Sequence, residues 1–257
     1  MANNIKIEPA IGEVLSIAQK VFEKFNIDFY LVGAVARDVQ FSERPELASL
    51  RKTNDVDIAI MINDEEHFYE IKNALLATGH FTAHKTEAIK LFYKHSIEVD
   101  LLPFGEIENE AREIKLHKPR LFVMDMPGFY EALPYKNIIE IDEDFKLHVC
   151  SLEGLVLLKL FAYSDKPDRT KDISDIEHIL KVYFDLCSDE IYEKNIDVMD
   201  LYETSNRKYL SLIAARIIGR KMKTILSGDK MLIERIKNIL GKRPTEEWNA
   251  IGEGFTE

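Results

Sequence analysis

Apolar side chains recur at three- and four-residue steps near the start of the chain, which is the spacing of an amphipathic helix. An apolar run then ends at Gly33, and the small residues after it predict a short helix. A second apolar run predicts a buried strand, followed by a helix with an acidic first turn and Gly79 just past its end. The predicted elements are a helix at 11–25, a strand at 28–32, a helix at 34–39, a polar surface excursion at 42–54, a strand at 56–62, a helix at 64–78 and a hairpin of strands at 88–93 and 96–102.

The pattern changes character in the second half of the chain. Residues 109–118 fit a helix or a strand equally well. Beyond Ser151 the periodicity is helical throughout, so we expect a boundary near Cys150. The predicted elements are strands at 137–142 and 146–150, helices at 152–163 and 168–184, and two further helices between 206 and 241. The fold class is therefore α/β (α+β), with a mixed sheet flanked by helices at 1–150 and a helical domain at 151–257.

Composition narrows the class of protein. A chain of 257 residues with 46% hydrophobic residues can bury one large core or two modest ones. We find no secretory leader pattern, and the longest apolar stretch, from Gly154 to Tyr163, is too short to cross a bilayer. Cys150 and Cys187 lie far apart, which suits thiols in a reducing compartment. We therefore expect a cytoplasmic protein without a membrane partner.

Charge is distributed unevenly along the chain. The net charge of −11 argues against a protein that coats nucleic acid generally. The segment 206–243 nevertheless holds eleven Lys or Arg residues against two acids, Asp229 and Glu234. A split of this kind indicates nucleic-acid contact, so an RNA partner for this segment is one hypothesis.

Candidate chemistry begins with "TNDVDIAI", in which Asp55 and Asp57 are two residues apart. In a strand this spacing sends both side chains to the same face, while Val56 and Ile58 point into the core. Paired carboxylates repel each other unless a positive group lies between them, and hard divalent cations such as Mg²⁺ prefer these oxygen ligands. A solvated strand edge explains the pair equally well.

A third carboxylate in "SIEVDLLP" shifts this balance. Asp100 lies among apolar neighbours, where a lone acid is costly to bury without a partner. If its strand lies beside the strand of Asp55 and Asp57, the three aspartates form a cluster suited to two metal ions. Glu98 alternates onto the same face and is either a competitor for this role or simply solvated.

The turn in "LVGAVARD" supplies a candidate phosphate site. Gly33 at a strand end, followed by small residues that begin a helix, leaves backbone N–H groups uncovered for an anion. A tight strand-to-helix turn also needs a glycine for its backbone alone, and a single glycine does not exclude that interpretation.

The three stretches "LVGAVARD", "DVDIAI" and "IEVDLL" together resemble the polymerase-β-like nucleotidyltransferase superfamily. The turn also resembles that of CCA-adding enzymes and poly(A) polymerases, and residues 151–180 are more similar to the AbiEii-type nucleotidyltransferases, many of which are toxins of toxin–antitoxin systems. The resemblance implies a nucleotidyltransferase domain at 1–150, NMP transfer from an NTP and a Mg²⁺ or Mn²⁺ cofactor. It implies catalytic and metal-binding roles for Asp55, Asp57 and Asp100, and nucleotide binding by Gly33, Ala34, Arg37, Asp38, Lys159, Lys171, Asp172 and Asp175.

Several alternatives stay open. Lys159 either reaches a cleft or extends to the surface, and 168–180 is equally explained as a helix N-terminus capped by Asp168 with a charged, solvated face. The acceptor hydroxyl belongs to an RNA (tRNA) end or to a small hydroxylated compound, as in aminoglycoside-modifying relatives. A third hypothesis is an inactive nucleotide-binding regulatory module. The resemblance also implies a toxin role with an antitoxin protein as partner.

Overall fold

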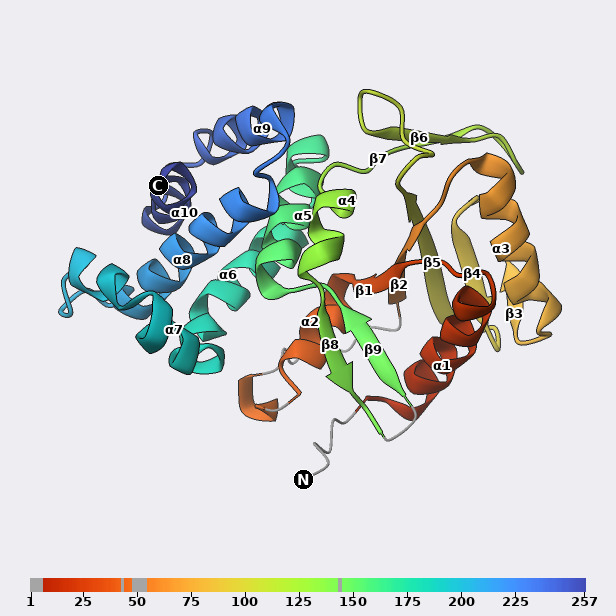
Figure 1. Ribbon diagram of the computed structural model, residues 1–257, viewed down its shortest axis with the longest axis horizontal. Helices are drawn as coiled ribbons and strands as arrows, with labels where there is room; N and C mark the ends of the chain where they lie inside the picture. The colour runs from red at the N-terminus through yellow and green to blue at the C-terminus, as the bar shows by residue number, and fades with distance from the viewer. Residues whose placement is uncertain (1–6, 43, 48–54, 143–144) are drawn as a thin grey trace. The chain divides into compact units, whose positions relative to one another are not determined.

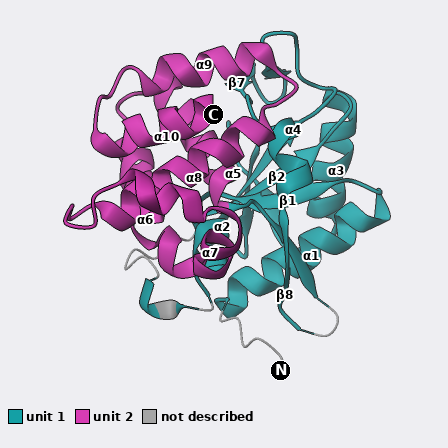
Figure 2. Cartoon of the chain, turned by 60° about the vertical axis from the view of Figure 1, so that its left-hand side comes forward, with its two compact units in different colours: residues 1–151 teal, residues 152–257 magenta. Residues whose placement is uncertain are grey.

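The computed structural model of the chain describes residues 7–42, 44–47, 55–142 and 145–257. The chain forms two compact units, Met1–Ser151 and Leu152–Glu257, which Figure 2 draws in different colours. The first unit is a mixed α/β structure and the second is helical, so the predicted fold class is confirmed.

The first unit contains a seven-stranded sheet in the order β3-β4-β5-β2-β1-β9-β8 (Figure 1). β2 pairs with β5, and β1 with β9, in parallel, while the other neighbours are antiparallel. A separate two-stranded ribbon is made by β6 and β7. The strands are β1 (Phe29–Val32), β2 (Asp55–Met61), β3 (Phe81–Ala83), β4 (Lys90–Tyr93), β5 (Ile97–Phe104), β6 (Glu113–Leu116), β7 (Phe122–Asp125), β8 (Asn137–Glu140) and β9 (Lys146–Val149).

Alternation along the central strands separates a core face from a polar face. In β2 and β5 the apolar positions such as Val56, Ile58 and Val99 are almost fully buried. Helix α1 (Pro9–Lys24) has a buried apolar side, and its Glu13 accepts a hydrogen bond of 2.6 Å from the hydroxyl of Tyr93 on β4. Helix α3 (Glu65–Ala77) packs against α1. At the start of β2 and β5 the opposite face carries polar side chains.

The sequence predicted most elements of the first unit. Helix α3 begins at an N-cap, Asp64, whose carboxylate accepts the backbone N–H of His67 at 2.8 Å, and the left-handed Gly79 follows its end. The ambiguous stretch 109–118 contains strand β6 rather than a helix. Strands β3 and β7, helix α4 (Phe129–Ala132) and the 3₁₀ turn Leu133–Tyr135 were not predicted. Of the excursion 42–54, residues 43 and 48–54 lie outside the described residues, and Pro45–Leu47 forms a short 3₁₀ helix.

The second unit is built from helices. Its elements are α5 (Leu152–Asp165), α6 (Thr170–Leu186), α7 (Ser188–Lys194), the 3₁₀ helix Ile196–Leu201, α8 (Tyr209–Ile225), α9 (Lys230–Leu240) and α10 (Glu246–Thr256). α5, α6, α8 and α9 match the predicted helices, whereas α7, the 3₁₀ helix and α10 were not predicted. Within the described parts of the chain, no helix combines the length and the apolar character needed to cross a bilayer.

Candidate active site

The parallel pairing of β2 and β5 brings the predicted acidic residues together. Asp57 is the register partner of Asp100, and Asp55 is the register partner of Glu98. Directly paired residues on neighbouring strands point to the same face of a sheet. Asp55, Asp57, Glu98 and Asp100 therefore share the polar face of β2 and β5.

A lysine on the next strand joins this group. Lys90 on β4 is the register partner of Asp100. Its ammonium donates a short hydrogen bond to Glu98 and lies 3.7 Å from Oδ1 of Asp100. Burial disfavours the charged ammonium, yet the hydrogen bond to Glu98 and the attraction of Asp100 outweigh it, so the pKa of Lys90 is raised. Glu98 is thus paired and not merely solvated.

Asp100 is more enclosed than its neighbour Glu98. Its side chain is 25% exposed, and its Oδ1 is buried without a hydrogen-bond partner in the described structure. Burial raises the pKa of Asp100, against the opposing attraction of Lys90. A buried oxygen that lacks a hydrogen bond marks a place where a further donor or a cation would be stabilised.

Gly33 packs directly on Asp57. It begins helix α2 (Gly33–Gln40) with φ +70°, and a Cβ atom placed on it would lie 2.0 Å from Oδ2 of Asp57. The turn therefore needs glycine both for its backbone conformation and for the approach of this carboxylate. The first turn of α2, including Ala34, adjoins the acidic face through this contact. Phosphate binding at this turn stays a prediction.

The other two residues predicted along the turn lie further into α2. Arg37 is only 2% exposed, and its guanidinium forms an ion pair of 2.8 Å with Asp38. A guanidinium this deeply buried requires a carboxylate partner, so the pair has a structural role whatever it binds. Nucleotide binding by Arg37 and Asp38 stays a prediction.

In the second unit, three of the four residues predicted from the AbiEii resemblance meet. The Lys159 ammonium on α5 lies 2.6 Å from Asp175 and 3.3 Å from Asp172, both on α6, and its side chain is 11% exposed. Arg169 pairs with Asp172 at 2.7 Å. Lys171 is exposed, and no described ion pair joins it to the cluster. Helix α6 begins at Thr170 with Arg169 as its N-cap, so a cap by Asp168 was the wrong alternative.

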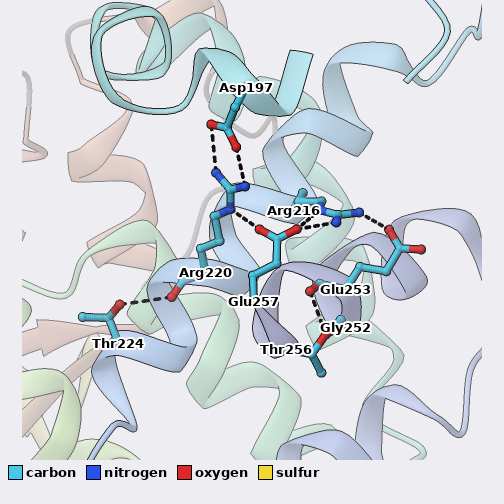
Figure 3. Close-up of polar contacts among 8 residues, drawn as sticks. All are labelled: Asp197, Arg216, Arg220, Thr224, Gly252, Glu253, Thr256 and Glu257. Carbon is cyan, nitrogen blue, oxygen red and sulfur yellow. Dashed lines mark hydrogen bonds and ion pairs between the residues drawn. The ribbon is translucent and has the colours of Figure 1, made fainter. Parts of the chain in front are cut away.

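Many charges of the basic segment are compensated inside the second unit. Glu257 on the C-terminal side of α10 bridges Arg216 and Arg220 of α8, and Asp197 pairs with Arg220 at 2.6 Å (Figure 3). The further pairs are Arg216 with Glu253, Lys208 with Glu246 and Glu247, Lys221 with Glu153 and Glu190, Lys237 with Glu234, and Arg243 with Glu177. Arg207, Lys223, Lys230 and Lys242 make no ion pair with any described residue. The basic surface is therefore smaller than the sequence indicates.

The acidic face offers the type of ligand atom that divalent metals bind, but its carboxylates do not converge on one point. Carboxylate oxygens are the donors that Mg²⁺ and Mn²⁺ prefer, and the buried Oδ1 of Asp100, which has no hydrogen bond in the described structure, fits a cation. In the described parts of the chain, however, no group of three or more Asp, Glu, His or Cys side chains is arranged to hold a metal ion. In this structure the positive charge close to Asp100 is the ammonium of Lys90.

Sequence reasoning did not identify Lys90 as part of the site. The residue lies inside the predicted strand 88–93, and nothing in its own neighbourhood distinguishes it from a surface lysine. The signal that could have found it is the hairpin: counting back from the connection at 94–96 pairs Lys90 with Asp100. A lone acid in a buried strand calls for a cation on the neighbouring strand, and the hairpin supplies one.

Comparisons with known proteins give fold-level likenesses at low identity. No protein-family model matches the chain, and no curated protein matches it. A nucleotidyltransferase-like protein from Paracoccidioides brasiliensis is 18% identical, with 95% of this chain and 93% of that chain covered and a TM-score of 0.42. The antibiotic-resistance factor ANT(2")-Ia, in complex with adenylyl-2"-tobramycin, is 12% identical (81% and 97% covered, TM-score 0.40). The CD-NTase CdnG from Bradyrhizobium diazoefficiens, in complex with GTP, is 13% identical (100% and 97% covered, TM-score 0.32). At these scores the assignment of the site depends on this chain's own residues.

Proposed function

We propose that the chain is a metal-dependent nucleotidyltransferase that transfers the NMP group of an NTP to an acceptor hydroxyl. The observation that carries the proposal is the parallel register of β2 and β5, which sets Asp57 beside Asp100 with Asp55 on the same face. Three carboxylates on one face are unfavourable unless positive charge is recruited to them. Their position next to the start of α2 supports a substrate that brings phosphate groups and a cation together.

The cofactor in this proposal is Mg²⁺ or Mn²⁺, and Asp55, Asp57 and Asp100 would hold it. When bound, such an ion supplies Lewis-acid polarisation of phosphate oxygens and stabilises the charge of the leaving pyrophosphate. Asp100 also has a role of its own. Its place beside Asp57 on the same face suits a group that accepts the proton of the acceptor hydroxyl.

The proposed reaction is one displacement at phosphorus. The acceptor oxygen forms a bond to the α-phosphorus of the NTP, and the bond from that phosphorus to the bridging oxygen of the β-phosphate breaks. The acceptor proton passes to Asp100, and pyrophosphate leaves. The N–H groups at the start of α2 orient the triphosphate in this scheme. Roles for Lys159, Asp172 and Asp175 in binding the nucleotide belong to the same proposal and follow from the family resemblance.

The proposal also includes the class of molecule that carries the acceptor hydroxyl. Six of the eleven basic residues in 206–243 already pair with carboxylates, which leaves few cations for the phosphates of an RNA. This compensation favours a small hydroxylated acceptor over an RNA end. The toxin role and an antitoxin partner have the family resemblance as their support.

The test is transfer of label from each α-³²P-labelled NTP to total RNA, to protein and to a panel of hydroxylated small molecules. We expect Mg²⁺-dependent labelling by the wild-type chain and its loss in Asp57→Asn. Asp28→Asn is the matched control, since it makes the same change at an exposed residue ahead of β1. Equal labelling by wild type and Asp57→Asn would contradict the mechanism. Mg²⁺-dependent NTP binding without turnover would favour the regulatory module instead.

A further inference from the structure

We infer that Lys90 is the resident counter-cation of the acidic face and competes with the divalent metal for Asp100. The inference rests on the proposed function, because it assumes that Asp55, Asp57 and Asp100 hold a metal. It assigns to Lys90 a positioning role: the lysine holds Asp100 in place without metal and sets how tightly metal binds.

The geometry places the ammonium of Lys90 beside two carboxylates of the acidic face, Glu98 and Asp100. Lys90 stands directly opposite Asp100 on β4, while Glu98 and Asp100 follow each other on the same face of β5. Its Nζ bonds to Glu98 and lies 3.7 Å from Oδ1 of Asp100, the atom that is buried without a hydrogen bond. A metal ion bound by this oxygen of Asp100 would therefore lie close to the ammonium of Lys90.

Charge determines the sign of the effect. Like charges a few ångströms apart in a partly buried site repel strongly, and a divalent ion is repelled twice as strongly as a monovalent one. The ammonium also neutralises carboxylates that would otherwise repel each other. Removal of the Lys90 charge should thus tighten metal binding and destabilise the metal-free protein. A purely structural ion pair would show the second effect without the first.

The experiment measures Mn²⁺ binding by the full chain, by electron paramagnetic resonance of free Mn²⁺, and thermal melting with and without the ion. We expect Lys90→Met to lower the Kd for Mn²⁺ about tenfold. Its Tm should be lower than that of wild type in EDTA, and added Mn²⁺ should raise that Tm by more than it raises the wild-type Tm. Lys90→Arg, which keeps the charge, should bind Mn²⁺ as wild type does.

Lys94→Met is the matched control. Lys94 lies on the same hairpin but pairs with Glu13 on α1 at 2.7 Å, so its removal takes away the same charge outside the acidic face. We expect its Kd for Mn²⁺ to stay within twofold of wild type. A comparable tightening in Lys94→Met would mean that net charge alone is responsible, and the inference would be overturned.

Two further variants separate the possible failures. Asp57→Asn should lose Mn²⁺ binding; if it binds as wild type does, the proposed metal site is wrong. If Asp57→Asn loses binding while Lys90→Met leaves the Kd unchanged, only the role of Lys90 is wrong. Lys90→Gln removes the charge but can still hydrogen-bond to Glu98. It therefore provides the same test with the same expected decrease in Kd if Lys90→Met does not fold.

Discussion

At the scale of single residues, Gly33 couples the conformation of a turn to the position of a carboxylate. Its positive φ and its contact with Asp57 are separate requirements, and each disfavours a side chain. The sequence predicted that a glycine was needed at this turn. It could not predict the contact with Asp57, because that contact depends on the antiparallel register in which Val32 pairs with Asp57.

Gly33→Ala tests the two requirements against a control, Gly79→Ala. Gly79 also has a positive φ, but a Cβ there meets nothing within 4 Å. The control should lower the free energy of unfolding by about 1 kcal/mol, the cost of a left-handed alanine. Gly33→Ala should cost roughly 2–5 kcal/mol, because overpacking adds to that strain. Urea titrations provide the measurement, and equal losses would show that the contact with Asp57 carries no energy.

His148 on β9 should make stability depend on pH. Burial lowers its pKa below the ordinary value of 6.5, repulsion from Lys136 adds to this, and its Nδ1 is buried without a hydrogen-bond partner in the described structure. The unfolded chain therefore binds a proton at a higher pH than the folded chain does. Stability is fully present above pH 6.5 and decreases as the pH falls below it.

The corresponding variant is His148→Phe, which keeps an aromatic ring beside Phe29, whose centroid lies 5.4 Å away. Between pH 7.5 and 5.5 we expect the urea midpoint of the wild type to fall more than that of the variant. A parallel fall in the two proteins would mean that other groups cause the acid sensitivity.

At the scale of elements, periodicity predicted the long amphipathic helices and the buried central strands. These elements have a strong periodicity of apolar residues, and some are followed by a residue that ends the element, such as Gly79 after α3. The elements that were not predicted are short or compositionally weak. β3 has three residues, α4 has four, and β7 carries apolar residues that remain exposed, such as Val123. Such elements depend on their neighbours in the fold, which a local pattern does not contain.

Helix α10 shows how tertiary packing replaces a sequence signal. Its contact with α8 brings backbones together, since a Cβ on Gly254 would lie 1.9 Å from the carbonyl oxygen of Arg216, and one on Gly219 would lie 2.1 Å from that of Ile251. Glycines lower helix propensity, and three of them in and around such a contact weaken the local pattern. The helix exists because the close approach buries Trp248, Ile251 and Phe255.

Gly219→Ala and Gly254→Ala should each lower the free energy of unfolding by roughly 3 kcal/mol, the upper range for overpacking, because the obstructing atoms belong to backbone. Gly252→Ala is the control on α10. A Cβ there meets only Leu240 Cδ1 at 4.0 Å, so the better helix propensity of alanine should leave the protein unchanged or about 1 kcal/mol more stable. Chemical denaturation checks all three, and similar losses would refute the close helix contact.

At the scale of the whole molecule, the largest difference between the sequence-based prediction and the structure concerns how much positive charge of 206–243 is left uncompensated. Five of the eleven basic residues of 206–243 form ion pairs with acids that lie elsewhere in the chain. Glu153, Glu177, Asp197 and Glu257 are among these acids, and they neutralise part of the segment in the folded second unit. Counting charges along a sequence cannot detect such pairing, whereas the acidic group was predictable because strand alternation is local.

The acceptor can be tested through the cations that remain uncompensated in the described structure. If an RNA end were held by Arg207, Lys223, Lys230 and Lys242, four phosphate contacts would give a logarithmic salt slope of about −2.8, so affinity would fall roughly 50-fold between 50 and 200 mM KCl. For a small hydroxylated acceptor we expect the acceptor KM to change less than about threefold over this range. Replacement of all four by Gln should also leave KM unchanged.

Arg220→Gln is the contrasting variant: it should lower Tm, because Arg220 pairs with Asp197 and Glu257. A steep salt slope that disappears in the fourfold variant would instead identify RNA as the acceptor, since only cations that contact phosphate release counterions when it binds.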